Sequence, residues 1–347
     1  MTMTSIDAEY LLREMARCHV IVVGDLMLDE YLWGEIGRIS PEAPVPVMHL
    51  RRSEQSLGGA ANVARNVASL GASVSAIGVA GADRAAASLL EELERAGIDR
   101  EGVVMEQTRP TTRKRRLMSL EHSQQVFRLD DESTDEISAT TEERLLSMLR
   151  ECISKAQVVI CSDYLKGVLT KRVLREAAAL ASRQGIPMIT APKDVRPEKY
   201  AGASILMPNL REFARLTGHP QNGDGAWMES AASCLLDGYG FSALLVTRGR
   251  DGMMLFEREN GNLRREDIVS LTSSVYDVTG AGDTALAVFA LAVAAGAVRS
   301  QAARLANIAA GVVVGKRGTV CVTPAELLGR VNEVGNSLSA PVHAGAA

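Results

Sequence analysis

The sequence predicts an α/β fold in which a central, mostly parallel sheet is covered by helices on both faces. Strand-like apolar runs alternate with helix-like segments along most of the 347 residues. No fixed-period repeat interrupts this alternation, and no low-complexity linker divides it. A chain of this length can hold one large α/β domain with a sizeable core. We expect a single domain over residues 1–331.

The alternation begins with a strand at 20–24 and a helix at 60–70, then a strand at 74–79 and a helix at 84–96 that ends at Gly97. Further predicted strands lie at 158–161, 187–190, 204–207 and 243–247, and further helices at 171–183, 210–216 and 226–236. A hairpin at 253–257 and 264–269 is expected because Asn260 and Gly261 supply its turn. Two long helices, 282–295 and 301–314, complete the domain.

Two stretches interrupt the alternation. Residues 31–52 hold three prolines within short β-branched segments, and residues 111–130 alternate basic and apolar side chains. We expect both to form strands outside the main sheet, which together make a small β-lid. The lid would cover the carboxyl edge of the sheet, where open α/β sheets bind their ligands. Two long surface hairpins are the alternative interpretation.

Composition restricts the functional classes. A net charge of −4 and a pI near 5.9 provide no broad basic field, so neither nucleic acid nor a membrane is an expected partner. The longest apolar run, 285–298, is shorter than the roughly 20 residues that span a bilayer and predicts a buried helix. Scattered cysteines and an N-terminus without a signal-peptide core indicate the cytoplasm. The tail at 332–347 is predicted to be disordered.

The stretch from Asp277 to Asp283 carries the strongest chemical signal. It opens the first long C-terminal helix, where Gly280, Ala281 and Gly282 allow backbone amides to point at an anion. Phosphoryl transfer needs placement, charge neutralisation and a carboxylate that accepts the proton of the acceptor hydroxyl. Asp283, one residue past this cradle, is the predicted base. The alternative is an aspartate that only stabilises its helix, by about 0.3–1 kcal/mol.

Acidic residues and a glycine pair in the first part of the chain predict a polyol site. Asp25 and Asp29 lie where the first strand meets the lid, and short carboxylates accept hydrogen bonds from adjacent hydroxyls. Gly58 and Gly59 open the next helix together with Asn62, which adds an amide side chain. A helix-capping role for Asp29 and a packing role for the glycine pair are the alternatives.

The sequence motifs of three other kinds of binding site are absent or incomplete. No GxGxxG follows the first strand, which disfavours a nicotinamide cofactor. Residues 311–317 have one residue too few between the glycines for a Walker loop and no Ser or Thr after Lys316, so we interpret them as a helix end. The histidines do not pair at metal-ligand spacing, which disfavours a structural zinc site.

Three motifs in this order resemble those of the ribokinase-like (phosphofructokinase-B) sugar kinases: the glycine pair with Asn62, the segment from Asn209 to Glu212, and the stretch 277–283. The resemblance covers most of the chain. It implies a ribokinase-like three-layer sandwich with a β-lid, with Asp283 as catalytic base and 280–282 as anion hole. It also implies ATP and Mg²⁺, with Asn209 and Glu212 organising the metal and the phosphates through water. Their spacing is consistent with this, since residues i and i+3 share a helix face.

The same resemblance assigns further positions. Thr247 and Gly249 are similar to the family's loop on the nucleotide side, and Asn307 lies where such kinases line the adenine pocket. Several relatives use a monovalent cation such as K⁺ beside the anion hole, which would involve Asp277. Lids of this kind often pair across a two-fold axis, so a homodimer through the lid is expected.

Four segments, at 24–31, 38–46, 124–130 and 162–167, resemble the bacterial D-glycero-D-manno-heptose-7-phosphate kinases of the ADP-heptose and lipopolysaccharide core pathway. Such kinases phosphorylate the anomeric O1 of a heptose 7-phosphate to give the 1,7-bisphosphate. A phosphorylated substrate calls for a second positive site. Arg116, Lys166 and Lys193 are candidates, although Ala191 stands where an acidic residue would precede the Pro-Lys pair. A solvated basic hairpin is the alternative for 113–116.

Two alternative functions stay open. One is a kinase of the same fold that acts on another sugar or sugar phosphate. The other is a non-catalytic sugar-phosphate sensor, against which Asp283, Asn209 and Glu212 argue. Many heptose kinases carry a fused nucleotidyltransferase domain with an HxGH motif. The histidines here are isolated, so we expect another protein to perform that step.

Overall fold

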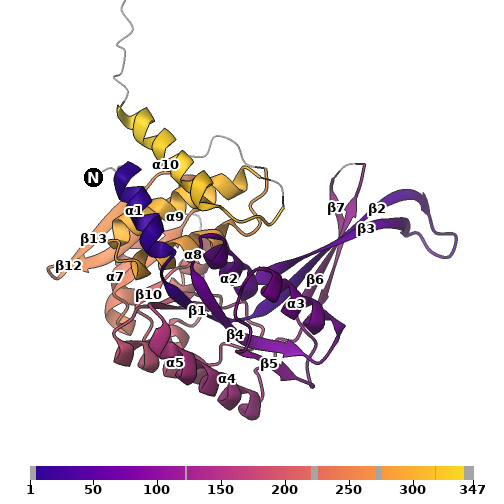
Figure 1. The fold of residues 1–347 in the computed structure, drawn as a ribbon, viewed down its shortest axis with the longest axis horizontal. Coiled ribbons are helices and arrows are strands. Elements are labelled where there is room, and N and C mark those ends of the chain that lie inside the picture. The colour runs from indigo at the N-terminus through magenta and orange to yellow at the C-terminus, as the bar shows by residue number, and fades with distance from the viewer. Residues whose placement is uncertain (1–4, 122, 220–225, 271–275, 317, 340–347) are drawn as a thin grey trace, which may run out of the picture.

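The computed structural model describes residues 5–121, 123–219, 226–270, 276–316 and 318–339, and within them a nine-stranded sheet forms the centre (Figure 1). Its strands are β1 (His19–Gly24), β4 (Ser73–Gly81), β5 (Val103–Glu106), β8 (Val158–Ser162), β9 (Met188–Ala191), β10 (Ile205–Leu206), β11 (Ala243–Thr247), β12 (Met253–Glu259) and β13 (Asn262–Ile268). Their order is β13-β12-β11-β10-β9-β8-β1-β4-β5. Pairing is parallel from β5 through β11, while β12 and β13 are each antiparallel to the strand before them.

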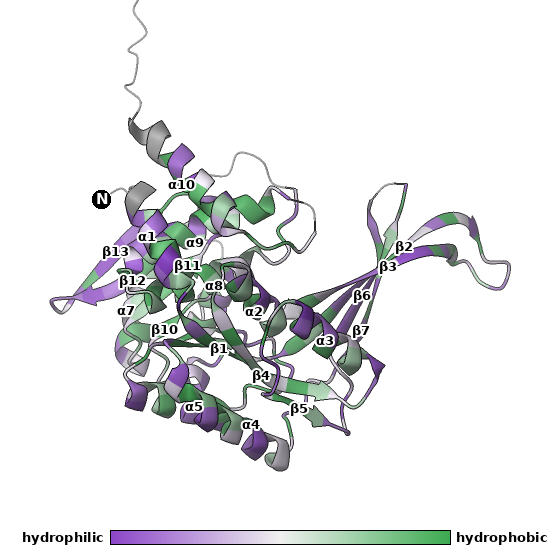
Figure 2. Ribbon diagram, in the orientation of Figure 1, coloured by the Kyte–Doolittle hydropathy of each residue, from purple (hydrophilic) through white to green (hydrophobic). Residues whose placement is uncertain are grey.

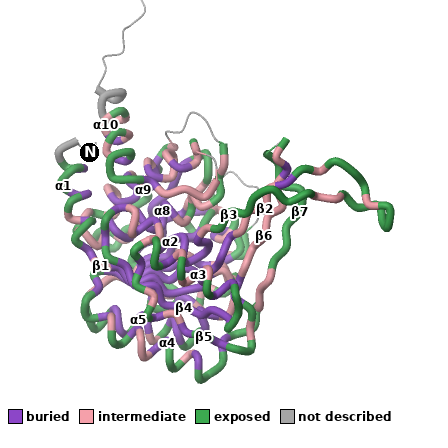
Figure 3. The backbone as a smooth tube through the Cα atoms, turned by 45° about the vertical axis from the view of Figure 1, so that its right-hand side comes forward, coloured by how far each residue is buried: buried purple, intermediate pink, exposed green. Residues whose placement is uncertain are grey.

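Helices cover both faces of this sheet, which gives the three predicted layers. One layer holds α1 (Ser5–Met15), α2 (Ala60–Ser69), α3 (Arg84–Arg95), α8 (Ala281–Ala294), α9 (Arg299–Val314) and α10 (Pro324–Ser339), and the other holds α4 (Ala139–Cys152), α5 (Lys171–Gln184), α6 (Leu210–Thr217) and α7 (Trp227–Tyr239). Successive residues of a strand point to opposite faces. Val20 and Val22 of β1 pack in the first core, and Ile21 and Val23 in the second. Figure 3 shows the sheet buried between these layers.

A second sheet stands apart from the first. Its strands are β2 (Leu26–Ile39), β3 (Pro46–Gly59), β6 (Arg113–Ser119) and β7 (Gln125–Asp131), in the order β3-β2-β6-β7. It projects from the body at the right of Figure 1, and its far end is exposed in Figure 3. The prediction that 31–52 and 111–130 form strands outside the main sheet is confirmed. Both long strands extend further into the body than expected, because Leu28 and Leu57 are buried at their base.

Helix α8 is the buried helix predicted from the apolar run. Its residues are buried without a break from Thr284 through Ala292. From Ala285 to Ala294 every residue of the helix is apolar, as expected for a helix enclosed by other elements; Figure 2 colours residues by hydropathy, with hydrophobic ones in green. Within the described residues, no helix combines the length and the apolar character that a membrane crossing requires.

The prediction that the tail is disordered from residue 332 is wrong for 332–339, because α10 continues to Ser339. The helix begins with a reciprocal cap, in which the backbone N–H groups of Thr323 and Glu326 each donate to the side chain of the other. Leu327 and Val331 are buried in the first core. A helix anchored in this way can propagate into a polar segment. Residues 340–347 lie outside the described part of the chain.

Three further elements, α1, α4 and β5, are missing from the predicted alternation. Strand β5 has only four residues, and the helices α1 and α4 mix apolar with many charged and polar positions. In α4, for example, only Thr141, Leu145, Leu146 and Leu149 are buried. Tertiary contacts stabilise such helices even where their sequence pattern is weak.

Candidate active site

The turn before α8 holds the residues predicted to cradle an anion. Gly280 is its N-cap residue, with a φ of 80° in the left-handed region that favours glycine. A Cβ there would lie 3.0 Å from Thr319 Cγ2 and 3.1 Å from Asn62 Nδ2, so the turn is closely packed. Ala281 and Gly282 line a cavity, and backbone N–H groups at a helix start have no intrahelical partners. The predicted cradle therefore faces open space.

The Asp283 carboxylate lies beside this turn and is held by two neutral donors. The Tyr164 hydroxyl donates to Oδ1 at 2.6 Å, and Asn62 Nδ2 donates to Oδ2 at 2.7 Å. No described basic side chain forms an ion pair with this carboxylate. Each carboxylate oxygen can accept more than one hydrogen bond. Asp283 therefore keeps the capacity to accept a proton from a ligand.

Burial raises the pKa of Asp283, and the nearby charge of Asp29 adds to this effect. The hydrogen bonds from Tyr164 and Asn62 and the charge of Arg65 oppose it. Burial and the Asp283 charge raise the pKa of the Tyr164 phenol well above its usual value, so this hydroxyl stays protonated and donates. A carboxylate with a raised pKa is better matched to proton transfer near neutral pH than an ordinary aspartate.

Helix α2 orients the Asn62 amide. Arg65 Nη2 donates to Asn62 Oδ1 at 2.7 Å and also to the Thr319 carbonyl at 3.0 Å. Because Oδ1 accepts from Arg65, the amide nitrogen is the atom that faces the carboxylate. One turn later, Asn66 Oδ1 accepts from the Thr284 hydroxyl at 2.8 Å. These contacts join α2 to the start of α8.

A cavity of about 590 Å³ opens beside the turn. Four of the five residues predicted to bind the nucleotide line it, namely Asn209, Thr247, Gly249 and Asn307. Ala281 and Gly282 line it as well, and the rest of its wall is mostly small or apolar: Gly252, Met253, Val278, Ala285, Ala310, Gly311 and Val314. A mostly apolar cavity with a few polar groups is typical of a small-molecule site.

Glu212, the fifth predicted nucleotide residue, is engaged in the cap of α6. Its N–H donates to Asn209 Oδ1, and the N–H of Asn209 donates to Glu212 Oε2, both at 2.9 Å. Its other oxygen accepts from Lys193 Nζ at 2.7 Å. Lys193 therefore lies beside the predicted nucleotide residues and not with the predicted substrate residues. The reason is topological, because β9, which precedes Lys193, is next to the β10 strand that leads into α6.

The Asp25 carboxylate is almost completely buried. It is 1% exposed, and its Oδ2 accepts from the N–H groups of Tyr164 at 2.7 Å and Lys166 at 3.1 Å, while Oδ1 accepts from Val168 N–H at 3.2 Å. Burial and the Asp163 charge raise the pKa of Asp25, and the three backbone donors oppose this. The carboxylate thus holds the loop after β8. This arrangement does not fit the predicted contact between Asp25 and a sugar.

Asp29, Gly58 and Arg116 meet at the base of the second sheet. Arg116 Nη1 donates to Asp29 Oδ1 at 2.7 Å. A Cβ at Gly58 would lie 2.8 Å from Asp29 Oδ2, so glycine is needed for the close approach. Gly59, with a φ of 54°, packs against the Asp25 backbone instead. In addition to burial, the Asp29 charge raises the pKa of Asp283, so the two carboxylates are close in space. Asp29, Gly58 and Arg116, all predicted substrate residues, therefore lie in one polar region with the predicted base.

Lys166 is paired with an acidic side chain. Its Nζ lies 2.7 Å from Glu132 Oε1, and Lys114 Nζ lies 3.0 Å from Glu132 Oε2. Burial raises the pKa of Glu132, but the hydrogen bonds and charges of the two lysines outweigh this and lower it. A phosphate bound here would have to displace Glu132 from at least one lysine.

Asp277 shapes the loop before the turn. Its Oδ1 accepts from Thr279 N–H at 2.9 Å and its Oδ2 from Gly318 N–H at 3.3 Å. A second cavity, of about 800 Å³, separates this loop from residues of the second sheet such as Tyr31 and Trp33. In the part of the chain that the structure describes, no group of three or more His, Cys, Asp or Glu side chains could hold a metal ion.

Tyr164, which contacts the predicted base directly, is a site residue that the sequence prediction missed. It belongs to the segment 162–167, which supports the family resemblance but gives this tyrosine no role. Its partner Asp283 is 119 positions away in the chain. No local pattern indicates such a contact, because it depends on how β8 and α8 are placed in the fold.

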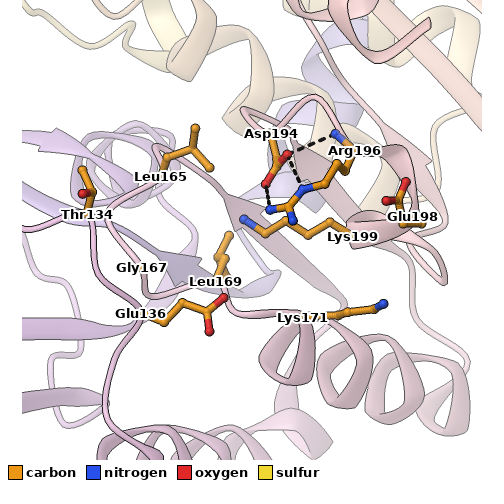
Figure 4. Close-up of a pocket in the computed structure, with 10 residues that line it drawn as sticks. All are labelled: Thr134, Glu136, Leu165, Gly167, Leu169, Lys171, Asp194, Arg196, Glu198 and Lys199. Atoms are coloured by element: carbon orange, nitrogen blue, oxygen red, sulfur yellow. Dashed lines mark hydrogen bonds and ion pairs between the residues drawn. The ribbon is translucent and has the colours of Figure 1, made fainter.

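The loop that carries Tyr164 also borders a cavity of about 300 Å³ (Figure 4). Leu165 and Gly167 line it from the loop side, and charged side chains of both signs line most of the remainder. Arg196 pairs there with Asp194 at 2.6 Å. The loop therefore has open space next to it, and its position depends on the polar anchors described above.

Comparisons with known proteins agree with this arrangement. A family model described as pfkB family carbohydrate kinase matches residues 19–326. The bifunctional protein HldE of Trichlorobacter lovleyi is 43% identical over 324 residues, which cover 93% of this chain and 65% of that protein. HldE of Nitrobacter hamburgensis is 44% identical over 308 residues, which cover 89% of this chain and 62% of that protein. The chain thus spans a little under two thirds of the length of these relatives.

Solved structures share the fold. Ribokinase of Arabidopsis thaliana, solved with ribose and ATP, matches with a TM-score of 0.69 and 22% identity over 91% of this chain and 99% of that one. Phosphofructokinase-2 of Escherichia coli, solved with potassium, matches with a TM-score of 0.73 and 18% identity over 92% and 99% of the two chains. These matches confirm the predicted ribokinase-like fold.

Proposed function

The chain belongs to the pfkB family of carbohydrate kinases, and from this premise we propose that it transfers the γ-phosphoryl group of ATP to the anomeric O1 of D-glycero-D-manno-heptose 7-phosphate. The product would be the 1,7-bisphosphate, an intermediate on the way to ADP-heptose and the lipopolysaccharide core. The observation that carries the proposal is the position of Asp283. It lies between the turn that lines the 590 Å³ cavity and the polar group around Asp29.

In the proposed mechanism, Asp283 accepts the proton of O1 while that oxygen attacks the γ-phosphorus. The new O–P bond forms as the bond from phosphorus to the bridging oxygen breaks, and ADP leaves. Backbone N–H groups at the start of α8 stabilise the charge on the transferred group. Mg²⁺, held through water near Asn209 and Glu212, would neutralise charge on the phosphates. Lys193 keeps Glu212 in place for this role.

The choice of substrate rests on two supports. The first is the resemblance of four segments to heptose-7-phosphate kinases, together with about 43% identity to proteins named HldE. The second is the group of cations near the predicted sugar site, which includes Arg116 and Lys166. Asp29 and Glu132 pair with these cations here, so a phosphate group of the substrate would compete with carboxylates for them.

A kinase of the same fold for another sugar phosphate is the second candidate, because the fold is shared with phosphofructokinase-2. A coupled ADP-release assay over a panel of substrates separates the two. The panel contains heptose 7-phosphate, fructose 6-phosphate, ribose and a nucleoside. We expect heptose 7-phosphate to give the highest kcat/KM, and the new phosphate to show ³¹P coupling to the anomeric proton. Preference for another member of the panel, or a phosphate on another carbon, would refute the proposed substrate.

The cavity of about 590 Å³ beside the α8 turn should bind the nucleotide. In Ala310→Leu, three additional carbon atoms project from α9 toward this cavity, and we expect the affinity for ATP to fall about tenfold or more. Ala310→Ser serves as the control, since it changes the volume little. Isothermal titration calorimetry with a non-hydrolysable ATP analogue measures both. Equal affinities in the two variants would place the nucleotide elsewhere.

The homodimer is a further part of the proposal. The second sheet exposes apolar side chains, among them Ile39, Leu50 and Phe127, each more than half exposed. Exposed apolar groups on a projecting sheet suit contact with a second copy of the chain. The mass of the protein in solution, measured by light scattering, tests this point.

A further inference from the structure

The geometry points to Tyr164 as a positioning residue for the base Asp283, held in place through its own backbone by the buried carboxylate of Asp25. This inference rests on the proposed function. It concerns how the base is oriented and kept ionised, and it gives a role to two residues that the family motifs leave without one.

The contact between Tyr164 and Asp283 is direct. The phenol oxygen lies 2.6 Å from Oδ1, the short distance typical of a hydroxyl that donates to an ionised carboxylate. Asn62 binds the other oxygen at 2.7 Å. With one donor on each oxygen, the plane of the carboxylate is defined from two sides. A free lone pair on either oxygen can then point at an acceptor hydroxyl that lies next to the α8 turn.

The tyrosine itself sits on a strongly anchored loop. Asp25 accepts hydrogen bonds from three backbone N–H groups of this loop, and Asp163 adds a second anchor. One oxygen of Asp163 accepts from Leu165 N–H at 2.8 Å, and its other oxygen accepts from Lys199 Nζ at 2.6 Å and from the Tyr200 hydroxyl at 2.7 Å. Leu165 has a φ of 57°, an unfavourable value for leucine, which the surrounding bonds maintain. Two buried carboxylates, at 25 and 163, therefore fix the direction in which residue 164 points.

The loop also borders the open space shown in Figure 4, in which Leu165 and Gly167 take part. On the side of this cavity, few side chains pack against the loop. The anchors from Asp25 and Asp163 must therefore provide much of its rigidity. A catalytic group needs this kind of support from neighbouring hydrogen bonds to stay within a fraction of an ångström of its productive position.

The hydrogen bond also affects the charge of the base. Four groups from three elements act on Asp283: Tyr164 from the loop after β8, Asn62 and Arg65 from α2, and Asp29 from β2. Burial and Asp29 favour the protonated acid, whereas the other three favour the carboxylate. Removing the phenol hydroxyl takes away one of the groups that favour the ionised form.

The test is Tyr164→Phe, which removes only the hydroxyl. We expect kcat at neutral pH to fall about tenfold to a hundredfold, while KM for ATP changes little. Asp283 must be ionised to accept a proton, so the rate falls as pH drops through its pKa. With an opposing hydrogen bond lost, this fall moves to higher pH in the variant. A full pH profile of kcat with heptose 7-phosphate measures the shift.

Two further variants separate positioning from general damage. Tyr239→Phe makes the same chemical change on α7, in the opposite helix layer, where the ring packs beside Phe241; its profile should match that of the wild type. Asp25→Asn replaces one accepting oxygen with a donor and should reduce kcat in the same direction as Tyr164→Phe. A profile of Tyr164→Phe that coincides with the wild type overturns the inference and leaves the proposed kinase activity intact.

If the wild type phosphorylates no member of the sugar panel, the proposed function is refuted. The effect of Tyr164 on Asp283 can still be measured without turnover. Carboxyl-¹³C aspartate labelling reports the titration of Asp283 directly, with the resonance assigned through Asp283→Asn. A titration midpoint at higher pH in Tyr164→Phe than in the wild type supports the role of the hydroxyl. An unchanged midpoint overturns it.

Discussion

Asp283→Asn is expected to lower kcat about 10²–10⁴-fold while the affinity for ATP stays close to that of the wild type. The amide has nearly the same shape, but it cannot take the proton of the acceptor hydroxyl. The nucleotide cavity should be little affected, because the carboxylate is turned toward Tyr164 and Asn62 and is absent from the cavity wall. Single-turnover kinetics and calorimetric titration measure the two quantities separately.

A matched control for this variant is Asp237→Asn. Asp237 lies on α7, its side chain is 60% exposed, and it pairs with Arg258 at the surface. We expect its turnover to equal that of the wild type. Near-normal turnover in Asp283→Asn, with folding intact by circular dichroism, would show that another group removes the proton and would refute the proposed mechanism.

Gly167→Ala is expected to destabilise the protein by about 3 kcal/mol or more. The residue has a φ of 84°, and an added Cβ would lie 1.8 Å from the carbonyl oxygen of Asp135. Both the turn and the segment that faces it would have to move. The hydrogen bond from Ile137 N–H to the Gly167 carbonyl, at 3.1 Å, joins the two and resists this movement. Because this glycine is in the loop that presents Tyr164, activity should fall together with stability. Urea unfolding and steady-state kinetics check both.

Gly185→Ala provides the comparison for this second variant. Gly185 also has a positive φ, of 68°, at the end of α5, but a Cβ there would meet no atom within 4 Å. Its cost should therefore be limited to the left-handed conformation, about 1–2 kcal/mol, with activity retained. If Gly167→Ala and Gly185→Ala lost the same unfolding free energy, the loop at Gly167 would have to accommodate the added Cβ freely. That result would contradict its anchoring by Asp25 and Asp163.

Much of the fold could be predicted from local patterns. The alternation of apolar runs predicts most strands of the main sheet, and the hairpin of β12 and β13 follows from its Asn-Gly turn. The second sheet was expected from two stretches that did not fit the alternation. Elements with few apolar positions, such as α4, were missed because the pattern there is weak and their stability comes from tertiary contacts.

Within the candidate site, residues in a local motif were easier to predict than residues whose contacts are distant in the chain. The turn at 280–282 is local, and the structure has it at the start of α8, as expected. Asn209 and Glu212 were expected to share a helix face, and the structure pairs them instead as the N-terminal cap of α6. Asp25 and Lys193 were predicted to bind substrate, but a carboxylate or an ammonium group can serve a ligand or a neighbouring protein group equally well. In the structure they bind the loop after β8 and the side chain of Glu212.

Properties that arise within a few residues are written in the local sequence: strand and helix periodicity, the left-handed Gly280 of the α8 turn, and the aspartate one residue beyond the turn. Which distant groups meet depends on the complete fold. The Asp283 carboxylate takes its donors from residues 221 and 119 positions away, and these choices follow from the order of strands and the packing of α2 against α8. Hydrogen-bond partners are selected by distance in space, and spacing along the chain does not contain that information.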